Sequence, residues 1–223
     1  MRKIAFYILI GLVLIFLIFR IGNWTGYLQN FRVYSTENEP TLHEQDWIFG
    51  TNLIEPRRLN FISYKVKEEK TDPYLKTHRL IGLPDDTLEI RNGVVFINGK
   101  NIDKQLNLKQ TYIASYEQIN ILKNKIKNLK VDRNKIVGLD SLIVNLSDKE
   151  VKKTFKPEMP IFDKPDKTIE EIYQKPWSQD QFGPLIIPEN KYFAIGDNRD
   201  VSYDSRYLGM IDKSDITAVL FVE

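Results

Sequence analysis

Near its N-terminus the chain has a long stretch without charged residues. Two basic residues precede residues 4–19, which are apolar throughout apart from one glycine, and Arg20 closes the run. As a helix this stretch spans about 24 Å, slightly less than the ~30 Å hydrocarbon layer of a bilayer. Trp24 and a snorkelling Arg20 would cover the difference at the interface. The pattern predicts a membrane-spanning helix over residues 1–24.

Two other interpretations of this stretch fit less well. A cleavable signal peptide needs small residues at a cut site after the apolar run, and none follows Phe19. A buried core helix would not be apolar all round with charges only at its ends. Because Arg2, Lys3 and the terminal amine outweigh Arg20, the N-terminus is expected in the cytoplasm. The chain is therefore expected to be a single-pass protein of a bacterial inner (cytoplasmic) membrane, with its main domain on the outer, periplasmic or extracytoplasmic side.

Short apolar and aromatic segments bounded by polar or proline-containing turns dominate the rest of the chain, as is typical of half-buried strands. Asn92-Gly93 lies between two apolar runs, 88–90 and 94–97, and favours a two-residue hairpin, because both turn residues tolerate positive φ. The core is therefore predicted to be mainly β. The other predicted strands are residues 46–50, 59–64, 185–187, 192–195 and 216–222.

The composition changes in the middle of the chain, which becomes rich in Lys, Asn, Asp and Glu. One helix-like stretch lies around residues 116–129, where Leu122, Ile126 and Leu129 recur at helical spacing. The lysines of this region could meet anionic lipid headgroups, but it also carries many acidic residues, so an ordinary solvated surface is favoured. The predicted organisation is a membrane anchor at 1–24, a β core at 25–103 and 176–223, and an inserted polar cap region at 104–175.

Composition narrows the classes of function. The chain has 223 residues, 32 Lys+Arg against 30 Asp+Glu, and no cysteine. The lack of cysteine excludes a disulfide scaffold, a thiolate zinc site and a cysteine nucleophile. A formal net charge of +2 gives no indication of nucleic-acid binding. We expect no cofactor and no metal, since His43 and His78 with scattered carboxylates form no obvious ligand set.

Three polar segments carry the candidate chemistry. They are residues 35–42, residues 77–86 and residues 196–209, the last of which follows directly on an apolar strand. Asp, Asn, Arg and Ser are so dense in the third segment that their side chains must form hydrogen bonds with one another or with a ligand. Because loops held on rigid strands are common places for function, a plain solvated loop is the weaker interpretation.

These segments, in this order behind one N-terminal anchor, resemble the type I signal peptidase (leader peptidase) family. Residues 196–206 match the family's motif Gly-Asp-Asn-Arg-x-x-Ser-x-Asp-Ser-Arg at every fixed position, and residues 79–86 match Arg-x-x-Gly-x-Pro-x-Asp. Pro40-Thr41-Leu42 fits the end of the nucleophile motif. The resemblance implies a coiled β-sheet or barrel catalytic core, with the signal peptides of exported precursors bound as an added strand.

The positions of the family's catalytic dyad are substituted in this chain. The resemblance assigns the nucleophilic serine to the position of Glu37 and the general-base lysine to that of His78. Asn38 replaces a methionine and Asp85 replaces a glycine. A serine attacks only when a neighbour removes its proton, and a lysine does so at neutral pH only when an apolar site lowers its pKa. Hydrolysis by the inherited Ser-Lys mechanism is therefore not expected.

The resemblance also assigns roles to the surrounding residues. It implies that Ser35 lies near the oxyanion hole and that Ser202 orients the base. Charge pairs are implied between Asp197 and Arg79 and between Asp204 and Arg206. The residues implied to line the peptide groove are Val33, Tyr34 and Thr77, and those of the structural motif are Arg79, Asp197, Asn198, Arg199, Asp204, Ser205 and Arg206.

Three functional hypotheses follow. In the first, which we favour, the chain has lost catalysis and binds signal peptides or partners an active signal peptidase, with Glu37 and His78 as a simple pair in a vacated cleft. In the second it is an active endopeptidase with a non-standard dyad. There Glu37 orients His78 to activate water, or Ser35 is the nucleophile with His78 as its base. In the third it is a purely structural membrane-anchored module.

Overall fold

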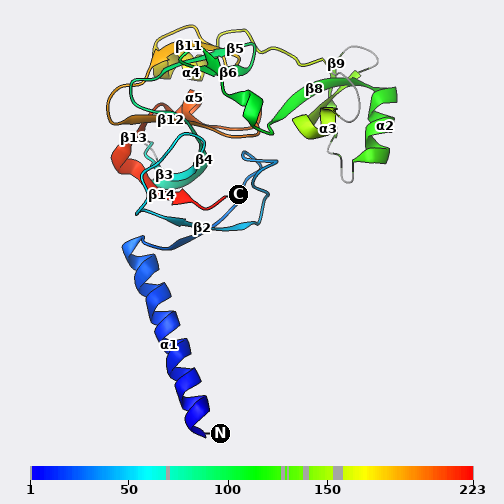
Figure 1. The fold of residues 1–223 in the computed structure, drawn as a ribbon. Coiled ribbons are helices and arrows are strands. Elements are labelled where there is room, and N and C mark those ends of the chain that lie inside the picture. The colour runs from blue at the N-terminus through cyan, green and yellow to red at the C-terminus, as the bar shows by residue number, and fades with distance from the viewer. Residues whose placement is uncertain are drawn as a thin grey trace.

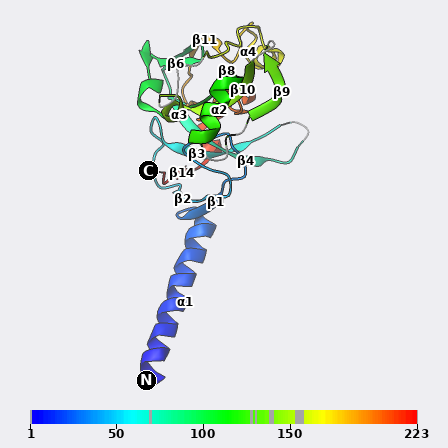
Figure 2. The same ribbon diagram turned by 90° about the vertical axis from the view of Figure 1, so that its right-hand side faces the viewer.

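The computed structural model describes residues 2–68, 71–126, 129, 131–137, 141–152 and 158–222. Helix α1, Arg2–Thr25, stands away from the rest of the protein in both views (Figures 1 and 2). Its segment Lys3–Thr25 is long and apolar enough to cross a membrane, and its most apolar window is 0% buried within the protein. This N-terminal apolar helix is consistent with a single-pass membrane anchor.

The largest sheet is antiparallel and has the strand order β1-β2-β14-β3-β4-β12-β13. The C-terminal strand β14 pairs with both β2 and β3, so the two ends of the core meet in one sheet. The strands predicted at 46–50, 59–64, 192–195 and 216–222 are confirmed within two residues at each end. The bounds are β1 Gln29–Arg32, β2 Trp47–Thr51, β3 Phe61–Val66, β4 Tyr74–Gly82, β12 Lys191–Ile195, β13 Ile211–Asp212 and β14 Ile216–Leu220.

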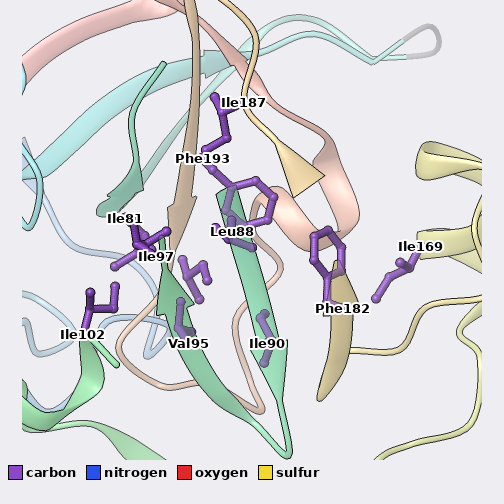
Figure 3. Close-up of a cluster of buried hydrophobic side chains, with 11 residues drawn as sticks. Ile81, Leu88, Ile90, Val95, Ile97, Ile102, Ile169, Phe182, Ile187 and Phe193 are labelled. Atoms are coloured by element: carbon purple, nitrogen blue, oxygen red, sulfur yellow. The ribbon is translucent and has the colours of Figure 1, made fainter. Parts of the chain in front are cut away.

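A second sheet has the order β11-β5-β6-β7. The predicted hairpin is confirmed, because Asn92 and Gly93 have φ values of 49° and 75° and Ile90 pairs with Val95. The main hydrophobic cluster gathers around this hairpin and includes Phe193 of the large sheet, so the two sheets share a core (Figure 3). The bounds are β5 Thr87–Arg91, β6 Val94–Ile97, β7 Lys100–Asn101 and β11 Gln181–Ile186, which begins four residues before the strand predicted at 185–187.

Residues 109–147 contain a third sheet, of order β8-β10-β9, which lies to one side of the other two (Figure 1). The sequence pattern predicted only a helix in this region, so the three strands are a correction. The helix is shorter than predicted and ends at Lys125, so Ile126 and Leu129 lie beyond it, while residues 127 and 128 are outside the described part. The bounds are β8 Lys109–Ser115, α2 Tyr116–Lys125, β9 Val131–Val137 and β10 Ser141–Ser147.

The third sheet is joined to residues 196–206, which we call the signature loop. The backbone N–H of Lys109 on β8 donates to the carbonyl of Asp197 (2.9 Å), and the N–H of Arg199 donates to the carbonyl of Lys109 (2.9 Å). The loop is therefore fixed by β12, which precedes it, and by β8 beside it. The remaining short helices are η1 Asp103–Gln105, α3 Asp148–Lys152, α4 Lys167–Tyr173, α5 Ser205–Leu208 and η2 Lys213–Asp215.

Candidate functional site

The signature loop holds the segment that carries Glu37. The backbone N–H of Asn198 donates to the carbonyl of Glu37 (2.9 Å), and its side-chain amide donates to the carbonyl of Thr36 (3.0 Å). On the far side, Leu42 anchors the same segment in a hydrophobic cluster. Backbone contacts thus fix the position of Glu37 independently of its side chain.

His78 lies on β4 with its side chain fully buried. Its Nδ1 is 2.8 Å from the hydroxyl of Tyr64, and its Nε2 is 3.2 Å from Ser202 Oγ and 3.4 Å from Glu37 Oε2. In a Ser-His-acid triad the serine and the acid bind opposite nitrogens of the ring. Here both lie at Nε2 and a tyrosine occupies Nδ1, so the geometry is not that of a triad.

Lys76 is a member of this site that the sequence analysis missed. Its Nζ is 2.7 and 2.9 Å from the two carboxylate oxygens of Glu37 and lies 5.8 Å from the centre of the Tyr203 ring. Lys76 precedes His78 by two residues on β4, and side chains two apart on a strand share a face. That spacing is the signal that could have identified it.

Four donors converge on the Glu37 carboxylate. Besides Lys76 and His78, the backbone N–H of Tyr203 donates to Oε1 (3.0 Å) and the hydroxyl of Ser35 donates to Oε2 (3.3 Å). Burial alone would raise the pKa of Glu37, but the hydrogen bond and charge of His78, the hydrogen bond of Lys76 and that of Tyr203 together lower it from 4.5 to about 2. The carboxylate is therefore ionised at neutral pH and is a weak base.

This pKa gives the stability of the protein a specific pH dependence. A carboxylate with a lowered folded-state pKa stabilises the fold above its unfolded pKa and loses that contribution as the pH falls toward the folded value. We expect the wild type to lose about 3 kcal/mol more than Glu37→Gln between about pH 5 and pH 2. Urea unfolding of both proteins in detergent at a series of pH values measures the difference. Parallel pH curves would contradict the assigned pKa.

The serine hydroxyl groups near the site already form hydrogen bonds. Ser35 Oγ donates to the carboxylate of Glu37, and the buried Ser202 Oγ is hydrogen-bonded to His78 Nε2. Lys76 is the nearest amine, and its Nζ is engaged in an ion pair with the Glu37 carboxylate at 2.7 Å. No second Ser-Lys pair of the inherited kind is therefore ready for catalysis around Glu37 among the described residues.

The implied charge pairs are present in the signature loop and next to it. Arg79 binds Asp197 through two hydrogen bonds of 2.6 and 2.7 Å. Asp204 and Arg206 pair at 2.9 Å with both side chains almost fully buried. Burial would raise the pKa of Asp204, but the charge and hydrogen bonds of Arg206 hold it below its usual value. Arg199 pairs with Asp103 instead of a loop residue, and Asn198 and Ser205 hydrogen-bond to backbone groups.

The residues implied to line a groove have different environments. Val33 packs in a hydrophobic cluster with Leu42, while Tyr34 is 75% exposed. The carbonyl of Thr77 accepts a hydrogen bond from the side-chain amide of Asn38 (2.7 Å). Asn38 thus covers one of the backbone groups that a strand added beside β4 would use.

The first half of β4 has an open edge. Leu80 exchanges backbone hydrogen bonds with residues 59 and 60. The backbone N–H and C=O groups of the even-numbered residues of β4 therefore point toward β3, and those of the odd-numbered residues point toward the opposite edge. On the other side, β12 pairs with β4 only from Arg79 to Gly82. Among the described residues, no strand pairs with Leu75 and Thr77 on this edge.

The described residues offer no ready metal site. Within them, no group of three or more His, Asp or Glu side chains is arranged so that it could hold a metal ion. His43 is exposed, and its Nδ1 lies 3.8 Å from Asp46 Oδ2.

Comparison with known proteins finds signal peptidases. The sequence model of the family described as "Signal peptidase, peptidase S26" matches residues 4–222. A signal peptidase I of Buchnera aphidicola subsp. Baizongia pistaciae is 28% identical over 86% of this chain and 68% of its own length. Signal peptidase I P of Bacillus subtilis subsp. natto is 27% identical over 95% of this chain and 82% of its own length. A crystal structure of a signal peptidase I from Enterococcus faecalis V583, 22% identical, covers 76% of this chain and all of its own with a TM-score of 0.37.

Proposed function

This chain belongs to the signal peptidase family, peptidase S26, and we propose that it is a membrane-anchored member that binds signal-peptide segments of exported proteins without hydrolysing them. The observation that carries this proposal is the ion pair of the Glu37 carboxylate with Lys76, at 2.7 Å, at the position that the resemblance assigns to the nucleophile. The working domain lies on the outer side of the membrane in this proposal, because the basic residues Arg2 and Lys3 at the start of α1 retain the N-terminus in the cytoplasm.

The chemistry of the site argues against peptide hydrolysis. Losing the serine nucleophile of a hydrolase typically costs on the order of 10⁶ in rate. An unpaired carboxylate about 4 Å from a developing oxyanion would add roughly 4 kcal/mol of repulsion. Because Lys76 neutralises Glu37, this second penalty is smaller here than for Glu37 alone. The missing nucleophile is therefore the main obstacle to cleavage.

Peptide binding is supported by the open edge of β4. Strands with unpaired backbone groups bind extended peptides as an added strand. Leu75 and Thr77 direct their backbone groups to that edge, although Asn38 already occupies the Thr77 carbonyl. A bound peptide would therefore either displace the Asn38 amide or pair mainly with Leu75. This contact needs no reactive side chain.

One observation favours active hydrolysis as a second candidate. Ser202 Oγ lies 3.2 Å from His78 Nε2, within reach of general-base catalysis. Ser202 is 5% exposed, however, so a substrate carbonyl would reach its hydroxyl only after the loop moved. Non-catalytic binding remains the function that the geometry supports best.

The proposal is tested by photocrosslinking in phospholipid vesicles that contain the full chain. The probe is a synthetic signal peptide with a benzophenone residue near its cut site, and its control is the same peptide with N-methylated backbone amides, which cannot pair along a strand. We expect intact peptide crosslinked to β4, and much less with the methylated control. Absence of crosslinking would favour a structural module, and a cleaved peptide would favour an active peptidase.

A further inference from the structure

A cavity of about 540 Å³ lies between the end of α1 and the β3–β4 hairpin. On one side it is lined by Trp24 and Thr25, and on the other by Lys65, Lys67 and Leu75. The side-chain amide of Asn52 donates to the carbonyl of Thr25 (3.1 Å), and that of Asn23 donates to Asn30 (2.9 Å). These contacts tie the end of α1 to the sheet, so both walls of the cavity belong to one framework.

The position of the cavity along α1 places it at the surface of a membrane. The uncharged run ends at Phe19, and Thr25 is six residues further, or about 9 Å along a helix. The headgroup layer on each side of a bilayer is about 5 to 8 Å thick. Because the uncharged run is about 6 Å shorter than the hydrocarbon layer, the residues that follow Phe19 complete the span, and the cavity opens at the level of the lipid phosphates.

The lining of the cavity is positively charged and partly apolar. It contains Lys65 and Lys67 and no Asp or Glu. Lys67 is paired with Asp215, whereas Lys65 is exposed and forms no ion pair with any described residue. Trp24 is 88% exposed, so its ring and its N–H donor face the surroundings, and Leu75 is 51% exposed. An exposed indole beside lysines is typical of residues at a membrane interface.

We propose that this cavity binds the headgroup of an anionic phospholipid in the outer leaflet, with Lys65 contacting the phosphate and Trp24 and Leu75 packing against the start of the acyl chains. This site rests on the proposed membrane topology but not on any interaction with a signal peptide. Lys67 contributes less than Lys65, because Asp215 already neutralises it. A bound lipid would fix the β3–β4 hairpin relative to the bilayer, and β4 carries both Lys76 and His78.

The test uses the full chain reconstituted into nanodiscs of phosphatidylcholine with an equal share of phosphatidylglycerol. Native mass spectrometry after release into detergent measures how many phosphatidylglycerol molecules each protein retains. A basic residue near a membrane surface contributes about fivefold in affinity for anionic lipid. We expect Lys65→Gln to retain phosphatidylglycerol about fivefold more weakly, Lys65→Arg to match the wild type and Lys67→Gln to show a smaller loss.

The matched control is Lys104→Gln, which removes an exposed lysine on η1 that does not line the cavity. Equal losses for Lys65→Gln and Lys104→Gln, or no loss for either, would overturn the proposal. Added inorganic phosphate should not displace the lipid, and displacement by phosphate alone would show an anion site without lipid selectivity. Because no peptide is present, failure of this test leaves the crosslinking experiment unaffected.

Discussion

The double substitution Glu37→Ser with His78→Lys should give this chain measurable signal-peptide cleavage. The backbone of Glu37 is held by Asn198 and does not depend on its side chain, so a serine there would keep its place. A lysine in place of His78 would lie in a fully buried position beside Ser202, where burial favours the neutral amine that a general base requires. The serine and the lysine that the proposed function regards as lost would thus stand at the positions now held by Glu37 and His78.

Lys76 assists this restoration instead of blocking it. Once Glu37 is removed, Lys76 loses its partner and stands on the same strand face as the new lysine. Two neighbouring ammonium groups disfavour each other's charged form, so the pKa of the buried lysine falls further. We expect cleavage at least about 10³-fold above the wild type, as part of the roughly 10⁶-fold that a serine nucleophile contributes.

Chromatography and mass spectrometry of a synthetic precursor incubated with the full chain in vesicles measure this gain. The single variants Glu37→Ser and His78→Lys are the controls, and each should remain inactive because it lacks one member of the pair. Inactivity of the double variant, with its fold intact, would contradict the claim that the rest of the site is preserved.

Replacing Asp204 by alanine should cause a large loss of stability. Asp204 and Arg206 are 0% and 2% exposed and pair at 2.9 Å. Removal of one partner from a buried ion pair leaves an uncompensated charge and costs about 3 to 5 kcal/mol. Since whole domains are stable by only about 5 to 15 kcal/mol, this is a large share of the total. Urea unfolding in detergent near neutral pH measures the loss.

The matched control is Asp212→Ala, which breaks an ion pair with Lys191 at 2.7 Å whose side chains are 51% and 34% exposed. Exposed pairs contribute about 0 to 1 kcal/mol, so we expect little change. Similar losses for Asp204→Ala and Asp212→Ala would contradict the view that burial of the Asp204 pair holds the signature loop together.

Local patterns in the sequence predicted the parts of the fold that depend on neighbouring residues. The apolar run of α1 is a continuous signal, and the hairpin at Asn92-Gly93 depends on two turn residues that accept positive φ. The sheet formed by β8, β9 and β10 was missed. Polar residues are frequent in β8, which begins Lys109-Gln110-Thr111, and in β10, which contains Asn145 and Ser147. The region was therefore interpreted from its composition instead of its alternation.

The candidate site was predicted in part. The resemblance to the family predicted that Glu37 and His78 share one site, and Glu37 Oε2 lies 3.4 Å from His78 Nε2. It did not reveal that Lys76 neutralises Glu37 or that Asn38 covers the Thr77 carbonyl. Each of these contacts joins residues 39 positions apart in the chain. Only the docking of the Glu37 segment against β4 creates them, and no local pattern encodes that docking.

The proposed function requires that an ionised carboxylate and its partners stand in place of the family's hydrolytic pair. The most direct test is cleavage of a signal-peptide precursor by the wild-type full chain in phospholipid vesicles, followed by mass spectrometry, with His78→Ala measured in parallel. We expect that neither protein releases product above the rate without protein. Product formed by the wild type and abolished by His78→Ala would contradict it.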